Sequence, residues 1–159
     1  RMLNTTPHDP SIPERAESES DVQRCAGRLV GLVRAHRWSE VARSFLPTAY
    51  IDLAGLDGRR GRHVAVGPLV ECWKGCAHGV LAVLENAATP DALALDGPHA
   101  VLRWRTGASG MSRAANCEVP AGIARLTLWQ QHHEWKVSAL TVTRVAAPAE
   151  ASAAMGLAR

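Results

Sequence analysis

Aromatic residues are scarce in this chain of 159 residues, which contains one tyrosine, one phenylalanine and five tryptophans. No run of roughly 18 apolar residues, the length that a membrane-spanning helix requires, is present. The first 20 residues are polar and lack the apolar segment of a secretory signal. The formal net charge of +3 is too small to indicate nucleic-acid binding. These absences predict a cytoplasmic protein with neither membrane nor nucleic acid as a partner.

Cysteine is also rare, and its four copies lack the compact spacing of a zinc ribbon. Cys72 and Cys76 lie four residues apart, so one face of a helix would carry both, and they could chelate a metal ion if other ligands helped. Cys25 and Cys117 have no such neighbour. Buried, reduced thiols are the expected state of the cysteines. We therefore expect no metal site and no cofactor.

The composition that remains is that of one globular domain, because 47% of residues are apolar and 21% are charged. Residues 122–145 predict two strands joined by a polar turn at 130–134, since Leu126 and Leu128 recur with a period of two, and so do Leu140 and Val142 among β-branched residues. A hairpin alone is not stable, so other segments must supply further strands or a covering helix.

Helices are expected first along the chain and strands mainly after them. Ser20 or Asp21 can cap a helix that runs to about Ala35; a second helix is expected over 38–45, and a third from Pro68 to the residues before Gly79. Further strands are expected over 48–53, 80–88 and 99–106, and a Gly- and Arg-rich loop over 55–62. Residues 1–19 are expected to be a flexible arm, 20–147 a single domain, and 148–159 a short helix or tail.

This segregation of helices and strands predicts the α+β class, with a curved antiparallel sheet of four to six strands wrapped around the N-terminal helices. Such a half-cone encloses a concavity between the sheet and the helices, which is a usual place for a small-molecule pocket.

Two stretches resemble scytalone dehydratase. The first is residues 37–52, Arg-Trp-Ser-Glu-Val-Ala-Arg-Ser-Phe-Leu-Pro-Thr-Ala-Tyr-Ile-Asp, and the second is residues 134–140, Glu-Trp-Lys-Val-Ser-Ala-Leu. The order of elements around them is similar to that of the nuclear-transport-factor-like, or SnoaL-like, cone superfamily. The resemblance implies a deep pocket, a homo-oligomer, and dehydration, isomerisation or aldol cyclisation of polyketide-like substrates.

The family's catalytic positions are matched only in part. The first of its two histidines falls on His78, and the second falls near Arg103 or Arg105. The tyrosine that ends the first strand falls on Leu53. Other family positions, a Tyr-Asp pair of the first helix and an Asn of the penultimate strand, fall on Val33, Arg34 and Arg125. The dehydratase mechanism is therefore not carried over intact.

Ketosteroid isomerase, of the same superfamily, offers a second alignment. Its Asp-Pro-Val-Gly motif is similar to residues 52–55, Asp-Leu-Ala-Gly, which would make Asp52 the proton-shuttling base. The two alignments differ by one residue, and one residue reverses the face of a strand to which a side chain points.

These considerations give a candidate catalytic set. His78 would move a proton, with Asp52 as the base or Tyr50 as the hydrogen-bond donor. The alternatives are a helix-terminal histidine for His78, a surface carboxylate paired with an arginine of the adjacent loop for Asp52, and a packed ring for Tyr50.

A second set would bind the substrate. Its members are Trp73, Trp104 and Trp129 as aromatic walls, with Leu53, Arg103 and Arg125 beside them. Ordinary core packing is the alternative for each tryptophan, and a solvated position for at least one arginine.

Two classes of function follow. The first is a small cofactor-independent enzyme, a dehydratase, isomerase or cyclase that acts on a hydrophobic small molecule by acid–base chemistry. The second is a non-catalytic small-molecule-binding or assembly protein of the same fold. In both, a homodimer or homotrimer is expected to form on the convex face of the sheet, with Val137 or Val142 pointing outward.

Overall fold

The computed structural model describes residues 12–53, 60–107 and 121–144. The helical elements in this part of the chain are α1 (Ile12–Arg34), α2 (Trp38–Arg43), α4 (Val66–Lys74), α5 (Ala77–Leu84) and the 3₁₀ helix η1 (Glu85–Ala88). The strands are β1 (Phe45–Asp52), β2 (Arg62–Ala65), β3 (Ala92–Asp96), β4 (His99–Thr106), β5 (Gly122–Gln131) and β6 (Glu134–Arg144).

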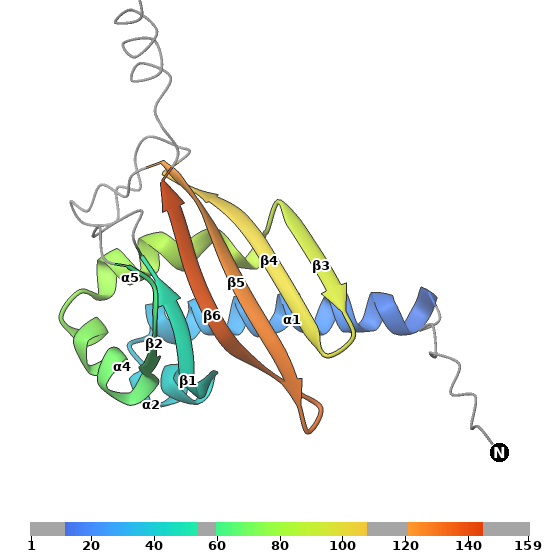
Figure 1. Ribbon diagram of the computed structural model, residues 1–159, viewed down its shortest axis with the longest axis horizontal. Helices are drawn as coiled ribbons and strands as arrows, with labels where there is room; N and C mark the ends of the chain where they lie inside the picture. Colours follow the sequence, from blue (N-terminus) through green and yellow to red (C-terminus); the bar gives the residue numbers. More distant parts are fainter. Residues whose placement is uncertain (1–11, 54–59, 108–120, 145–159) are drawn as a thin grey trace, which may run out of the picture.

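The six strands form one curved, unclosed sheet in the order β2-β1-β6-β5-β4-β3, and α1 runs across one side of it (Figure 1). Four of the five neighbouring pairs are antiparallel, whereas β1 and β6 run parallel. A parallel pair needs a long crossover, and here everything between β1 and β6 in the chain serves as that connection. The predicted α+β class with a curved sheet over N-terminal helices is confirmed.

The core lies between α1 and the side of the sheet that faces it, which we call the inner face. On α1, Val22, Ala26, Leu29 and Val33 are buried at the spacing of one helical face. On β4 every second residue is buried from Ala100 onwards, and on β5 every second residue from Gly122 to Leu128; the residues between them are exposed or half-exposed. The opposite side, the outer face, carries the residues between them.

Helix α1 begins at Ile12, so residues 12–19 are helical and the boundary expected at Ser20 or Asp21 is wrong. An ion pair one helical turn apart, Arg15–Glu19 at 3.6 Å, joins two charged side chains in this first part. High polarity had suggested an arm, but a polar surface helix has the same composition. Residues 1–11 and the expected tail at 148–159 lie outside the described residues.

The strand expected over residues 80–88 is instead helical, as α5 and η1. A short continuous apolar run fits a buried strand or a buried helix equally well, and only its packing decides. Ala82, Val83 and Leu84 are buried, and α5 and η1 both contact α1. Strands β2 and β3 were not predicted, because β2 has four residues and β3 consists mainly of alanine and leucine, which favour helices.

The β5–β6 hairpin was predicted, and its turn is confined to His132 and His133. Both histidines have positive φ, 49° and 65°, as a two-residue hairpin turn of type I′ requires.

The expectation that Val137 and Val142 point outward is wrong, because their exposed fractions are 0% and 2%. The pairing register of β5 with β6 shifts between Thr127 and Leu128, which leaves Ser138 as an extra residue in β6. Such a bulge lets Val137 on one side of it and Leu140 on the other both face the core.

Candidate functional site

Tyr50 and Asp52 lie on the outer face of β1. Their neighbours Ala49 and Ile51 are buried in the core, and successive side chains of a strand point to opposite faces. The Tyr50 ring contacts the ring of His63 on β2, with centroids 5.3 Å apart. A Cβ added at Gly61 would lie 2.2 Å from the Tyr50 hydroxyl, so this glycine permits the close approach of the ring. Tyr50 and Asp52 therefore do not point into the space between sheet and helices.

Arg103 and Arg125 also lie on the outer face, and both are exposed. The two arginines are paired directly opposite each other on β4 and β5. Arg125 is in turn paired with Thr141 on β6, and Thr141 with Asp52 on β1, so the four residues form one row across the sheet. We call Asp52, Thr141, Arg125 and Arg103 the outer-face row. Most of its flanking positions are small or β-branched: Ala92, Ala94, Val101, Ile123, Thr127, Ala139 and Thr143. Tyr50 and the exposed Arg105 also flank the row.

The other predicted binding residues divide between the two faces. Trp104 is 1% exposed on the inner face, and its indole Nε1–H donates a hydrogen bond of 2.8 Å to the carbonyl oxygen of Val83. Trp73 is buried, with its ring 5.7 Å from that of Phe45. Leu53 packs against the core from the end of β1. Trp129 is 41% exposed and contacts the ring of His99 at a centroid distance of 4.8 Å.

His78 is exposed in the first turn of α5. Since α5 contacts α1, it lies on the inner side of the sheet, whereas Asp52 and Tyr50 lie on the outer face. The structure therefore does not bring the three predicted catalytic residues into one site. Among the described residues, no group of three or more His, Cys, Asp or Glu side chains is placed to hold a metal ion.

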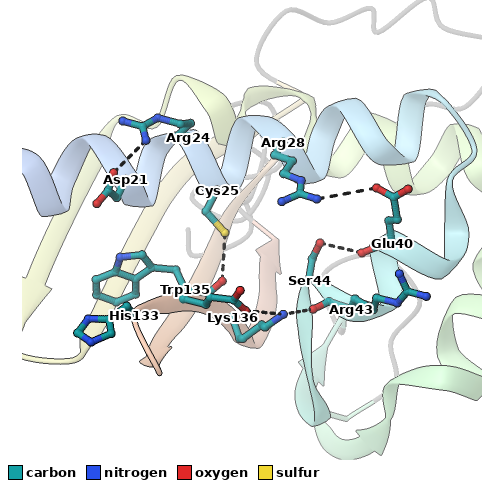
Figure 2. A pocket seen from close by; sticks show the side chains of 11 residues that line it. Asp21, Arg24, Cys25, Arg28, Glu40, Arg43, Ser44, His133, Trp135 and Lys136 are labelled. Atoms are coloured by element: carbon teal, nitrogen blue, oxygen red, sulfur yellow. Dashed lines mark hydrogen bonds and ion pairs between the residues drawn. The ribbon is translucent and has the colours of Figure 1, made fainter.

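A polar groove of about 540 Å³ lies elsewhere, where α1, the end of α2 and the start of β6 meet. Strand β1 begins opposite Val137, so the first residues of β6 extend beyond it and leave this space open. Figure 2 shows Cys25 pointing from α1 towards the backbone of Trp135, while Lys136 reaches across to the end of α2. The lining residues are Asp21, Arg24, Cys25, Arg28, Glu40, Arg43, Ser44, His133, Glu134, Trp135 and Lys136.

Hydrogen bonds tie the three walls of the groove together. The Cys25 thiol donates to the carbonyl oxygen of Trp135 at 3.4 Å. Lys136 Nζ donates to the carbonyl oxygen of Arg43 at 2.6 Å, near the C-terminus of α2, where a cation is favoured. Burial raises the pKa of the Cys25 thiol, although the nearby charges of Lys136 and Arg28 oppose that rise. The thiol is therefore protonated and unreactive at neutral pH.

Each acid of the groove has a cationic partner. Asp21 pairs with Arg24 at 3.1 Å, Glu134 with Lys136 at 3.4 Å, and Glu40 with Arg37 and, at 3.9 Å, with Arg28. Exposed pairs of this kind contribute little stability. They do neutralise the carboxylates, so the groove can hold charged groups but offers no poised acid–base pair.

No protein-family model matches the chain, and no curated protein matches it. Solved structures do. One of unknown function from Mycobacterium tuberculosis matches at TM-score 0.59 and 13% identity, over 97% of this chain and 86% of that one. A suspected dehydratase of the NTF2-like family from Streptomyces avermitilis matches at TM-score 0.58 and 9% identity, over 84% and 99%. An NTF2-like protein from Novosphingobium aromaticivorans matches at TM-score 0.55 and 9% identity, over 89% and 96%.

The chain has the NTF2-like fold. The expected cone fold is thereby confirmed, whereas the resemblance of residues 37–52 and 134–140 to scytalone dehydratase stays a prediction. None of the described helices has the length and the apolar character that a membrane span needs.

Sequence reasoning missed the groove of this NTF2-like structure entirely. Cys25, Glu40 and Lys136 come from three segments that are distant in the chain, and no local spacing joins them. The expectation that the cysteines are buried is also wrong for two of them. Cys72 and Cys76 are exposed, and Cys25 is half-buried. Cys117 lies outside the described residues.

Proposed function

We propose that this NTF2-like chain is a binding or assembly protein that forms a homodimer through the outer face of its sheet. The observation that supports the proposal is the outer-face row. Arg103 and Arg125 are directly opposite each other on neighbouring strands, an arrangement that is unfavourable for like charges. Neither has an ion-pair partner within the described ranges 12–53, 60–107 and 121–144. An anion from outside the chain would relieve this repulsion.

A second copy of the chain carries that anion in a suitable place. Asp52 and Arg125 lie on either side of Thr141 in the row. A two-fold axis along β6 at Thr141 would exchange these two sides, so Asp52 of each copy would face Arg125 of the other. Most of the residues that flank the row are small or β-branched, which favours close packing of two sheets. Asp52, which the sequence suggested for catalysis, and Arg125, which it suggested for substrate binding, would then serve assembly.

The test is the molar mass of the wild-type chain, measured by size-exclusion chromatography with light scattering over a range of micromolar concentrations. We expect about twice the chain mass, with dissociation promoted by high salt because salt screens the attraction between Asp52 and Arg125. A single chain mass across the whole range would contradict the proposal.

An enzyme that acts on a hydrophobic, polyketide-like small molecule is the second candidate, favoured by the fold shared with the suspected dehydratase. In this chain His78 would be its acid–base group, without help from the outer face. His78→Ala should then lower turnover by about 10²- to 10⁴-fold while the fold remains intact. Unchanged turnover in a folded His78→Ala variant, with His63→Ala as the matched control, would exclude this role.

A further inference from the structure

The polar groove between α1, the end of α2 and the start of β6 carries more cations than carboxylates. Its cations are Arg24, Arg28, Arg43 and Lys136, and its carboxylates are Asp21, Glu40 and Glu134. Arg37 adds a further cation, because it pairs with Glu40 although it does not line the groove itself. Five positive charges therefore stand against three negative charges, which leaves a surplus of two.

Two arginines account for this surplus. Glu40 is bound most closely by Arg37, and Arg28 approaches it only to 3.9 Å, a long distance for an ion pair. Arg43 has no ion pair within the part of the chain that the structure describes. The guanidinium groups of Arg28 and Arg43 are therefore available to a ligand. A guanidinium presents its N–H groups in a planar fork that matches the oxygen atoms of a phosphate group.

The positive charge reaches the middle of the groove. Figure 2 shows Arg28 on one side and Lys136 on the other side of the space between Cys25 and Ser44. The ammonium group of Lys136 is held in place by its hydrogen bond of 2.6 Å to the carbonyl oxygen of Arg43. Burial raises the pKa of the Cys25 thiol, and the charges of Lys136 and Arg28 both oppose that rise, so both cations act at this point. An anion in this space is attracted from both sides.

One hydrogen-bond donor of the groove has no partner. The indole Nε1–H of Trp135 is buried and meets no acceptor within the described residues. Trp135 is only 8% exposed, and Figure 2 shows its ring beneath α1, at the opposite end of the groove from Glu40. Buried donors without an acceptor are rare in proteins because they cost free energy. A ligand that fits both ends of the groove therefore carries an acceptor in addition to its anionic group.

We propose that the groove binds a small phosphomonoester, with its phosphate group between Arg28 and Lys136 and an oxygen atom of its organic part accepting from the Trp135 indole. A phosphomonoester carries a charge of about −1.5 to −2 at neutral pH, which offsets the surplus of the groove. The volume of about 540 Å³ is that of a small-molecule site and leaves room for an organic part beside the phosphate. None of the lining residues belongs to the outer-face row, so this site is independent of the proposed dimer.

An NMR titration of the full-length, ¹⁵N-labelled protein tests this proposal. The probes are glucose 6-phosphate and inorganic phosphate, each compared with sodium chloride at the same ionic strength. We expect glucose 6-phosphate to cause saturating shifts in the backbone amides of Cys25, Ser44 and Lys136 and in the indole N–H of Trp135. Inorganic phosphate should bind more weakly, because it cannot reach from the arginines to Trp135. Equal affinities would identify the free phosphate ion as the ligand and overturn the proposed ester.

Single variants locate the two contacts. Arg28→Gln and Arg43→Gln should each raise the dissociation constant of glucose 6-phosphate at least about fivefold, a modest effect for a charge-assisted contact because both side chains are exposed. Arg34→Gln, the same change at an exposed position outside the groove, is the matched control and should have no effect. Trp135→Phe should weaken binding of glucose 6-phosphate but not of inorganic phosphate. Shifts that do not saturate, that sodium chloride reproduces, or that Arg34→Gln weakens equally would overturn the proposal.

Discussion

Replacing Trp104 with alanine is expected to lower the free energy of unfolding by about 3–5 kcal/mol, the usual cost of deleting a large buried ring. Trp104 is among the largest fully buried side chains of the described core. Its indole N–H also bonds the carbonyl oxygen of Val83, and removal of the donor leaves that buried acceptor without this bond. The inner face of β4 and the end of α5 would therefore lose both packing and a polar link.

Chemical denaturation with urea measures this effect, and two variants control it. Trp104→Phe keeps most of the ring but lacks the donor, so its cost should be smaller, about 1–3 kcal/mol. Trp129→Ala removes a tryptophan that is 41% exposed, and its cost should stay near 0.5 kcal/mol. Equal losses for Trp104→Ala and Trp129→Ala would show that Trp104 is not the core residue described.

Arg125→Glu is expected to weaken the proposed dimer by at least about 30-fold, because breaking a charge pair within an interface costs about 2–5 kcal/mol. The substitution removes the cation that faces Asp52 of the second copy and puts a like charge there. Within one chain, a glutamate at position 125 can instead pair with Arg103 across the strands. The free energy of unfolding of the monomer should therefore not fall.

Arg34→Glu, at an exposed position on α1 far from the sheet's outer face, is the matched control for the charge change. It should leave the dissociation constant of the dimer unchanged in sedimentation equilibrium. If Arg34→Glu and Arg125→Glu weakened association equally, net charge and not the outer-face row would be responsible.

Local patterns predicted the elements whose two faces differ clearly. The alternation around Leu126 and Leu128 correctly predicted the β5–β6 hairpin. Strand β4 was predicted with its observed bounds, His99–Thr106. The strand predicted over residues 80–88 was wrong, because a continuous apolar run does not show whether its residues follow the helical or the strand period. The Ser138 bulge shifts side chains between faces, and no residue of β6 signals it in advance.

Prediction of the candidate site was limited because the two family alignments differ by one residue at the end of β1. The alignment with scytalone dehydratase points Leu53 into the cone, whereas the alignment with ketosteroid isomerase points Asp52 into it. The strand itself decides, since Ile51 is buried and Asp52 lies on the other face. Tyr50, Arg103 and Arg125 also lie on the outer face. Most of the polar candidate residues are therefore on the side of the sheet that faces away from the helices. The groove at Cys25 and Lys136 depends on tertiary packing and had no local signal.

The most direct test of the proposed assembly is an exchange of charges between the two ends of the contact. Sedimentation equilibrium would compare Asp52→Arg, Arg125→Glu and the variant that carries both substitutions. The two-fold arrangement predicts that each single variant dissociates to monomers and that the double variant dimerises again, because opposite charges face each other once more. A double variant that remains monomeric, or single variants that stay dimeric, would contradict it.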